Sequence, residues 1–444
     1  MNFYKTVVLL SSIKINHHTM VIINRLITLI VIAVVILLSG CSSNEDPTNK
    51  LLANGKTSLF EKVTEPESTK TNTSSDETLN LSSDSYGFSG GGATAGTSAW
   101  GGGDPNGQFE PGILTAGEWN DLNNWDFWNN LLSNQDYYDD VNKWNLKKIK
   151  RYSFVVADKN ESLVANAQIT LLSDDVEIWK TRTDNKGKAT LWSDLELNGL
   201  TARIKFDNTQ VVVTDVLDYD KGINMVHLDK TIENKKSIDI YFAVDATGSM
   251  GDEIHYLKAE LNNVIERIKQ NNSILEMRFG SVFYRDEGDE YVTNDISFTT
   301  DQAKLTNFIS NQSAAGGGDY PEAVHSALEV AIIQNTWNDN ASTRILFLLL
   351  DAPPHYTQEV ISSLEISLTI AAEKGIKIVP ITASGINKST EYLMRSFAML
   401  TNGTYVFITD DSGVGNDHLE PTIGEFEVEK LNDLLVRLVG EYVP

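Results

Sequence analysis

The sequence is poor in residues on which several common functions depend. Only one of its 444 residues is a cysteine, Cys41, so no pair is present for a disulfide or for a thiol-based metal site. Basic residues are also few: 36 Lys and Arg stand against 61 Asp and Glu, which gives a formal net charge of -25. Because nucleic acids are bound by basic surfaces, this balance argues against a nucleic-acid partner. An acidic surface instead favours solubility and the binding of cations.

The N-terminal region holds an apolar run that falls short of full membrane-spanning length. The stretch Leu26–Leu38 is shorter than the roughly 20 residues that a transmembrane helix needs. Arg25 precedes this stretch and small residues follow it, which is the order found in a secretory signal peptide. We therefore predict a signal peptide over residues 1–40, and a start at Met20 would give it an ordinary length.

The letters "LSGC" at the end of this segment resemble the lipobox of bacterial lipoproteins. The resemblance implies that Cys41 becomes the acylated N-terminus and anchors the protein in a membrane. It also implies a location in the bacterial cell envelope, with the outer membrane expected and the chain facing the periplasm or the surface. The alternative is a chance cysteine behind an ordinary signal peptide.

Two segments of distinct composition follow the predicted signal peptide. Residues 41–107 are rich in Ser, Thr, Asn, Gly and acidic residues, and this composition predicts a disordered tether. Residues 108–149 are rich in tryptophan, and Trp125 and Trp128 share one face if the segment is helical. Because clustered tryptophan is usually buried, we predict an aromatic latch that packs against the next domain. A platform that binds sugars is the alternative.

Residues 150–230 show the pattern of an all-β domain. Short stretches rich in β-branched and aromatic residues, such as "RYSFVVAD" and "TQVVVTDV", are separated by turn sequences such as "TDNKG". Several short strands at this spacing predict a β-sandwich. The stretches "ANAQITLL" and "TRTDNKGKATLW" resemble the carboxypeptidase-regulatory-like, or transthyretin-like, sandwich of bacterial surface proteins. Since we find no catalytic constellation here, we expect this domain to act as a structural spacer.

From residue 236 to residue 444 the pattern changes to alternating strands and helices. The run "RILFLLL" is apolar throughout, as a strand that is covered on both faces must be. Within residues 251–270, apolar side chains recur at helical spacing at Ile254, Leu257, Leu261, Val264, Ile265 and Ile268. We therefore predict a doubly wound, Rossmann-like α/β domain, a fold that binds ligands at the carboxyl ends of its strands.

Oxygen-bearing side chains gather in three loops of this predicted domain. The segment "AVDATGSM" follows the first strand, "GGGDYPEAVHSAL" precedes a helix, and "LLLDAPPH" ends a later strand. A parallel sheet brings such loops together at one edge. Carboxylates and hydroxyls with few imidazoles suit Mg²⁺ or Mn²⁺ better than Zn²⁺. The candidate ligands are Asp245, Thr247, Ser249, Asp319, Glu322 and Asp351.

These three loops, in this order, resemble the von Willebrand factor A family and its metal-ion-dependent adhesion site. The family motif Asp-x-Ser-x-Ser corresponds to Asp245-Ala-Thr247-Gly-Ser249, and the aspartate of the family's third loop corresponds to Asp351. "DATGSM", "GGGDYPEA" and "DAPPH" are similar to the subgroup of hemicentin-like proteins and α-kinase-associated A domains. The resemblance implies a divalent cation whose coordination is completed by an acidic side chain of a protein partner.

One position departs from the family pattern. The family's second loop supplies a threonine, whereas the spacing from Ala327-Leu328 nominates Glu322 and the glycine run nominates Asp319. Either choice replaces a hydroxyl with a carboxylate. A carboxylate at Glu322 would hold the cation more tightly and weaken its pull on a partner's acid. The alternative is that Glu322 only offsets the dipole of the helix that starts after Pro321.

Three histidines lie near these loops in the sequence. His325 shares a helical face with Glu322, and His355 follows "DAPP". We expect both to be surface imidazoles, like His255, and a second metal site or a catalytic base is the less favoured interpretation.

Together these features predict a lipid-anchored envelope protein that binds a protein partner through a divalent cation. We expect no enzyme activity, because the sequence has no HExxH motif and no convincing nucleophile–base pair. One alternative is a metal-assisted hydrolase that uses Asp245, Glu322, Asp351 and His355. Another is a metal-independent envelope assembly protein, in which the polar strand ends only cap helices.

Overall fold

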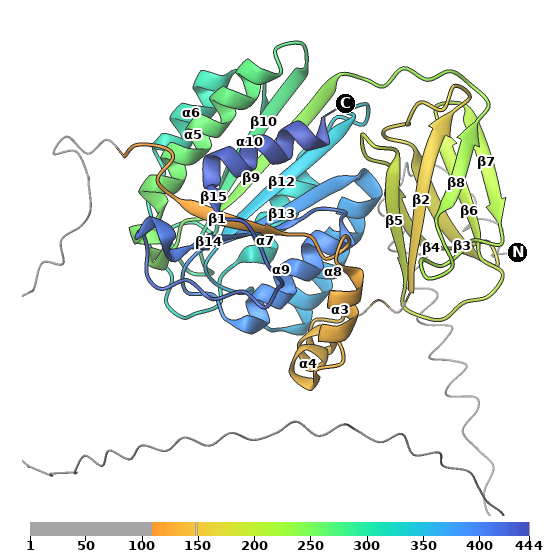
Figure 1. Cartoon of the computed structure of the whole chain (residues 1–444). Coiled ribbons are helices and arrows are strands. Elements are labelled where there is room, and N and C mark those ends of the chain that lie inside the picture. The colour runs from red at the N-terminus through yellow and green to blue at the C-terminus, as the bar shows by residue number, and fades with distance from the viewer. Residues whose placement is uncertain (1–108, 147, 149, 444) are drawn as a thin grey trace, which may run out of the picture. The chain divides into compact units, whose positions relative to one another are not determined.

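The computed structural model describes residues 109–443, with residues 147 and 149 left out (Figure 1). The predicted signal peptide, Cys41 and the predicted tether all lie outside the described residues. Within the described residues, no helix has both the length and the apolar character that crossing a membrane requires.

A large mixed sheet of eight strands forms the centre of the α/β unit (Figure 1). The strands are β1 (Thr115–Trp119), β9 (Ser237–Asp245), β10 (Glu276–Tyr284), β11 (Thr293–Thr299), β12 (Thr343–Leu350), β13 (Ile376–Thr382), β14 (Tyr405–Thr409) and β15 (Glu429–Lys430). Their order across the sheet is β11-β10-β9-β12-β13-β14-β1-β15. The strands from β10 to β14 in this order run parallel, whereas β11 and β1 are antiparallel to their neighbours. The predicted α/β class is confirmed.

Helices cover both faces of this sheet (Figure 1). One face packs against α5 (Ile254–Asn271), α6 (Gln302–Ser310) and α10 (Leu431–Tyr442). The other packs against α7 (Val324–Leu328), the π-helix η3 (Glu329–Gln334), α8 (Gln358–Lys374) and α9 (Lys388–Leu400). Successive residues of β9 alternate between the two cores, and both sets are fully buried. This burial on two sides explains why the strand sequences are apolar throughout.

The Trp-rich segment contributes a strand to this sheet. β1 pairs with β14 on one side and with β15 on the other. Two helices, α3 (Trp125–Leu131) and α4 (Gln135–Lys143), follow β1 before the β-sandwich begins. Because β1 precedes the sandwich and β9 follows it, the sandwich is an insertion between two strands of one sheet. The α/β unit therefore extends into residues 108–149, beyond the boundary that the sequence suggested.

The tryptophans of this segment pack as core residues. Trp128 is buried and stacks on Tyr392 of α9, with ring centroids 4.8 Å apart and planes 9° apart. Trp125 lies against Trp192 of the sandwich at a centroid distance of 5.7 Å. The segment thus contacts both the α/β unit and the sandwich.

Two buried charged groups hold the same segment in place. Glu260 of α5 is fully buried, and its carboxylate accepts hydrogen bonds from the backbone N–H groups of residues 112–114 at 2.7 to 3.3 Å. Arg395 of α9 is also fully buried and forms a bidentate pair with Asp121. Its Nη2 and Nε donate to Oδ1 and Oδ2 of Asp121 at 2.7 and 3.0 Å. Removal of Asp121 would take the bidentate partner from Arg395, and removal of residues 112–114 would take the donors from Glu260, and both changes are costly for a buried charge.

The inserted domain is the predicted sandwich. Its strands are β2 (Lys150–Asp158), β3 (Gln168–Ser173), β4 (Val176–Arg182), β5 (Lys188–Ser193), β6 (Thr201–Phe206), β7 (Thr209–Thr214) and β8 (Asn224–Leu228). One sheet has the order β5-β2-β8 and the other β4-β3-β6-β7. The sheets enclose a core to which Phe154, Ile169 and Trp192 contribute fully buried side chains. The burial of these side chains between the sheets is that of an ordinary sandwich core.

Candidate functional site

The three oxygen-rich loops meet at the carboxyl edge of the large sheet. Asp245 is the last residue of β9, and Asp351 directly follows β12, the parallel neighbour of β9. Tyr284, the last residue of β10, pairs with Asp245 on the other side. The parallel register therefore places the carboxyl ends of β9, β10 and β12 together.

The first loop brings its three candidate ligands into one hydrogen-bonded chain. Oδ1 of Asp245 accepts bonds from the backbone N–H of Thr247 at 2.9 Å and from its hydroxyl at 2.7 Å. The hydroxyl oxygens of Thr247 and Ser249 lie 3.1 Å apart. Asp245 and Thr247 are fully buried, whereas Ser249 is exposed. The alternate spacing of these residues thus produces one continuous row of oxygens that reaches the surface.

The glycine run of the second loop lets Glu322 approach this row. Gly317 has a φ of +70°, and a Cβ added there would lie 2.9 Å from Oε1 of Glu322 and 3.3 Å from Cβ of Thr247. Only glycine fits between the two side chains in this backbone conformation. The backbone N–H of Glu322 donates to the carbonyl of Pro353 at 2.9 Å, which joins the second loop to the third. Asp319, in contrast, is exposed.

Each of the three carboxylates that meet here has one oxygen without a partner. Oδ2 of Asp245, Oε2 of Glu322 and Oδ1 of Asp351 are buried and accept no hydrogen bond. A buried carboxylate oxygen without a donor is energetically costly, so a group that approaches these oxygens with positive charge would be stabilising.

The same crowding shifts the titration of these groups. Burial raises the pKa of Asp245 to about 6. Burial, followed by the charge of Asp245, raises the pKa of Asp351 to about 7. Glu322 is the most affected, because burial and then four neighbouring carboxylates raise its pKa to about 9. Like charges in a desolvated site resist simultaneous ionisation, so the cluster retains protons near neutral pH.

Two further carboxylates belong to the site although the sequence reasoning did not single them out. Asp286 and Asp289 lie in the loop after β10, and their charges are among those that raise the pKa of Glu322. Oδ2 of Asp289 accepts the backbone N–H of Asp286 at 3.1 Å and that of Gly317 at 2.8 Å. The signal was present in "FYRDEGDE", where acidic residues directly follow an apolar strand.

The nearby histidines have different surroundings. Nε2 of His355 lies 2.6 Å from Oδ1 of Asp286, so this half-buried imidazole is tied to the carboxylate cluster. His325 is directed towards Glu287, with 3.9 Å between Nε2 and Oε1. His255 is exposed and stacks on Phe109.

The donor set fits a hard divalent cation only if hydroxyls take part. In the described part of the chain, no group of three or more His, Cys, Asp or Glu side chains is arranged to hold a metal ion. The row from Asp245 to Ser249 adds two hydroxyl oxygens to the unpartnered carboxylate oxygens. Oxygen ligands of these two kinds are those that Mg²⁺ and Mn²⁺ prefer.

Comparison with known proteins identifies the α/β unit. Residues 239–414 match the family described as von Willebrand factor A domain. This part of the chain is a von Willebrand factor A domain. The match runs from β9 to just beyond β14, so it includes Asp245, Glu322 and Asp351 but leaves out β1, the sandwich and α10.

Several proteins share this A domain. Alpha-protein kinase vwkA of Dictyostelium discoideum is 26% identical over 220 residues, which cover 48% of this chain and 34% of that protein. Von Willebrand factor A domain-containing protein 7 of Rattus norvegicus is 29% identical over 113 residues, 26% of this chain and 12% of that protein. The alignments thus span about a third or less of these relatives.

A solved structure described as conserved hypothetical protein BatB from Bacteroides thetaiotaomicron is 13% identical to this chain. It covers 46% of this chain and 98% of its own, with a TM-score of 0.33.

Proposed function

We propose that this chain is a lipid-anchored protein of the bacterial cell envelope whose A domain binds a protein partner through a divalent cation. The A domain supports an interaction or adhesion function. The observation that carries the finer proposal is the meeting of Asp245, Glu322 and Asp351, each with a buried oxygen that has no hydrogen-bond partner. The similarity to the A domain of vwkA supports a place in the α-kinase-associated subgroup.

All three loops would contribute residues that hold the cation. Asp245, Thr247 and Ser249 would hold Mg²⁺ or Mn²⁺ from the first loop, and Glu322 and Asp351 would do so from the other two. The bound cation would supply positive charge that offsets these carboxylates and attracts an acidic side chain of the partner. Because Ser249 is exposed while Asp245 and Thr247 are buried, a partner would reach the site at Ser249.

We propose binding rather than turnover at this site. The nearest candidate for a catalytic base is His355, whose Nε2 lies 2.6 Å from Oδ1 of Asp286. A general base must reach the proton of a nucleophile, and in the described part of the chain no hydroxyl or thiol is hydrogen-bonded to His355. Assays of the full chain on phosphoester and peptide substrates test this point, and turnover that is lost in His355→Ala would contradict it.

Millimolar Mg²⁺ or Mn²⁺ is expected to raise the melting temperature of the full chain by several degrees. A ligand that binds only the native state stabilises it, by about 2.7 kcal/mol at a hundredfold excess over Kd. Asp245→Asn should abolish this gain, whereas Asp295→Asn, at an exposed position of β11, should retain it. Scanning calorimetry with and without EDTA measures the effect, and a melting temperature that ignores both cations would refute the metal site.

Glu322→Thr is expected to weaken Mg²⁺ binding and to strengthen the binding of acidic partners. The substitution removes one negative charge from the site and restores the hydroxyl of the family pattern, so a bound cation keeps more of its charge. Asp319→Ser serves as the matched control, because Asp319 is exposed. Titration calorimetry decides the assignment. If Asp319→Ser and not Glu322→Thr weakens Mg²⁺ binding, the ligand of the second loop is Asp319.

Cys41→Ser is expected to release the protein from the membrane fraction. Cys41 follows the lipobox-like "LSG" and is the chain's only cysteine. Stable anchoring requires more than one acyl chain, as expected for a bacterial lipoprotein, and none can attach to serine by this route. Detergent partitioning of cell fractions measures the change. A Cys41→Ser protein that still partitions into detergent would contradict the proposed anchor.

The partner itself is best sought by its dependence on the cation. A pull-down from envelope extracts with the full chain should recover it in Mg²⁺, and EDTA should release it. The Asp245→Asn variant is the control, since a partner that binds this variant equally well does not use the proposed site.

A further inference from the structure

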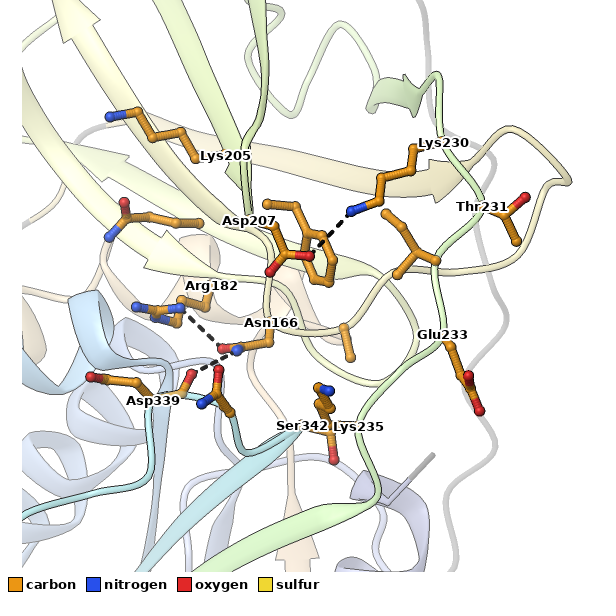
Figure 2. A pocket seen from close by; sticks show the side chains of 15 residues that line it. Asn166, Arg182, Lys205, Asp207, Lys230, Thr231, Glu233, Lys235, Asp339 and Ser342 are labelled. Atoms are coloured by element: carbon orange, nitrogen blue, oxygen red, sulfur yellow. Dashed lines mark hydrogen bonds and ion pairs between the residues drawn. The ribbon is translucent and has the colours of Figure 1, made fainter.

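A cavity of about 460 Å³ lies where the sandwich meets the α/β unit, near the amino ends of β9 and β12 and thus at the opposite ends of these strands from Asp245 and Asp351 (Figure 2). Asn166 and Arg182 of the sandwich form one wall, and residues 339–342 before β12 form another. The connecting segment from Lys230 to Lys235 completes the lining. Small-molecule sites typically measure about 300–1,000 Å³ and favour junctions between domains, so this cavity is of suitable size and place.

Two guanidinium groups share one neutral acceptor at the cavity wall. Nη1 of Arg182 and Nη1 of Arg344 donate to Oδ1 of Asn166 at 3.2 and 3.1 Å. Asn166 itself adopts a left-handed backbone conformation, with φ at +65°. Within the described residues, no carboxylate oxygen lies within 4 Å of either guanidinium group.

The donors of Arg182 are not all used. Its Nε is buried and has no hydrogen-bond partner. Arg344, only 2% exposed, donates its remaining bonds to the main-chain carbonyls of Asn338 and Asp339. Burial and the charge of Arg182 lower the pKa of Arg344 to about 10, so both groups keep their charge at neutral pH. Arg182 is half-buried and Arg344 is buried, and the charge of Asp339 acts on both without forming an ion pair with either. An oxyanion that accepts a hydrogen bond from Arg182 would offset this charge more directly.

Lysines add positive charge at the mouth of the same cavity. Lys205 and Lys235 are exposed lining residues, and in the described structure neither lies in an ion pair. Lys230 pairs with Asp207 at 3.2 Å across exposed side chains. Figure 2 shows Glu233 directed away from Arg182. The lining thus carries four cationic side chains (Arg182, Lys205, Lys230 and Lys235) against three carboxylates (Asp207, Glu233 and Asp339), a slight positive balance in a chain whose net charge is -25.

We propose that this cavity binds a small phosphate-bearing ligand. Its phosphate would accept hydrogen bonds from Arg182, the guanidinium with free donors, while Lys205 and Lys235 face the remaining charge. A phosphate group suits this arrangement better than a single carboxylate does, because it offers more acceptor oxygens and more charge to several cations. The ligand would contact the sandwich, the connecting segment and the residues before β12 together.

Titration calorimetry of the full chain with inorganic pyrophosphate tests the proposal. The buffer contains EDTA, so that pyrophosphate cannot act by removing a metal. Arg182→Gln should lower the affinity roughly tenfold, the usual effect of losing a charge-assisted hydrogen bond. Because the stem of Arg182 packs against Gly375, a folding check by circular dichroism accompanies this variant.

A double variant avoids that risk to folding. Lys205→Gln with Lys235→Gln changes only exposed side chains and should lower the affinity severalfold and flatten its salt dependence. Lys304→Gln, an exposed lysine of α6, is the matched control and should bind as the unchanged chain does. Asp245→Asn should also bind normally, which separates this cavity from the proposed cation site at the carboxyl edge of the large sheet.

Three results would overturn the proposal. The first is no binding of pyrophosphate by the unchanged chain at millimolar concentration. The second is an affinity that neither Arg182→Gln nor the double lysine variant alters. The third is tighter binding of citrate than of pyrophosphate, which would assign the cavity to carboxylates instead.

Discussion

A fragment of residues 236–444 is expected to be unfolded, whereas a fragment of residues 109–444 is expected to fold. The shorter fragment lacks β1, the strand that lies between β14 and β15. It also leaves Glu260 without the backbone donors of residues 112–114 and Arg395 without Asp121. Breaking one buried charged pair costs about 3–5 kcal/mol. The loss of this pair, together with the donors to Glu260 and the hydrogen bonds of β1, rivals the roughly 5–15 kcal/mol by which a domain is stable.

Urea unfolding followed by far-ultraviolet circular dichroism compares the two fragments. Point variants of the full chain separate the causes. Asp121→Ala should cost about 3–5 kcal/mol, because it removes the bidentate partner of the fully buried Arg395 and leaves Glu391 as the remaining carboxylate partner. Asp139→Ala, at an exposed position of α4, should stay within about 0.5 kcal/mol of the unchanged chain. Cooperative unfolding of the fragment 236–444 would show that β1 is dispensable.

In EDTA, the full chain is expected to lose stability as the pH rises from about 4 to about 9. The folded-state pKa values of Asp245, Asp351 and Glu322 are about 6, 7 and 9, above the ordinary 3.8 of Asp and 4.5 of Glu. The folded protein therefore binds more protons than the unfolded chain in this range. The three carboxyl groups contribute fully to the free energy of unfolding below their pKa values in the unfolded chain. This contribution is lost as the pH rises through their pKa values in the folded protein.

Mg²⁺ should reverse this trend, because a cation binds the ionised carboxylates and competes with their protons. Thermal melts at pH 5, 7 and 9, with EDTA or Mg²⁺, measure both effects. Glu322→Gln removes the group with the most raised pKa, so its melting temperature in EDTA should fall less between pH 7 and 9. A stability in EDTA that is flat or rising over this range in the unchanged chain would contradict the charge crowding.

The strands of the A domain were visible in the sequence because they are buried on both faces. "RILFLLL" and "IKIVPITA" correspond to β12 and β13 almost residue for residue. β1 was not, because "TAGEW" is short and mixes small, acidic and aromatic residues. The residues on either side of it are held by Glu260 and Arg395, which come from distant parts of the chain. A local sequence pattern cannot predict contacts with residues that are so distant in the chain.

The candidate site, like the fold, could be predicted from the sequence only in part. The spacing of Asp245, Thr247 and Ser249 implied their hydrogen-bonded row, since all three lie in one loop. The choice between Asp319 and Glu322 stayed open, because it depends on how the glycine run folds. In the fold, Gly317 leaves room for Glu322 beside Thr247, while Asp319 is exposed, and the choice of ligand stays a prediction.

The insertion of the sandwich between β1 and β9 has a mechanical consequence. A spacer placed in series would carry any force between the N-terminal end of the chain and the A domain. Here a pull applied at residue 109 passes to β1, and through its hydrogen bonds directly into β14 and the large sheet. The hydrogen bonds from residues 112–114 to the carboxylate of Glu260 also transmit this force to α5, the helix that begins shortly after Ser249. The sandwich lies outside that path, so tension between residue 109 and the carboxyl edge would bypass it.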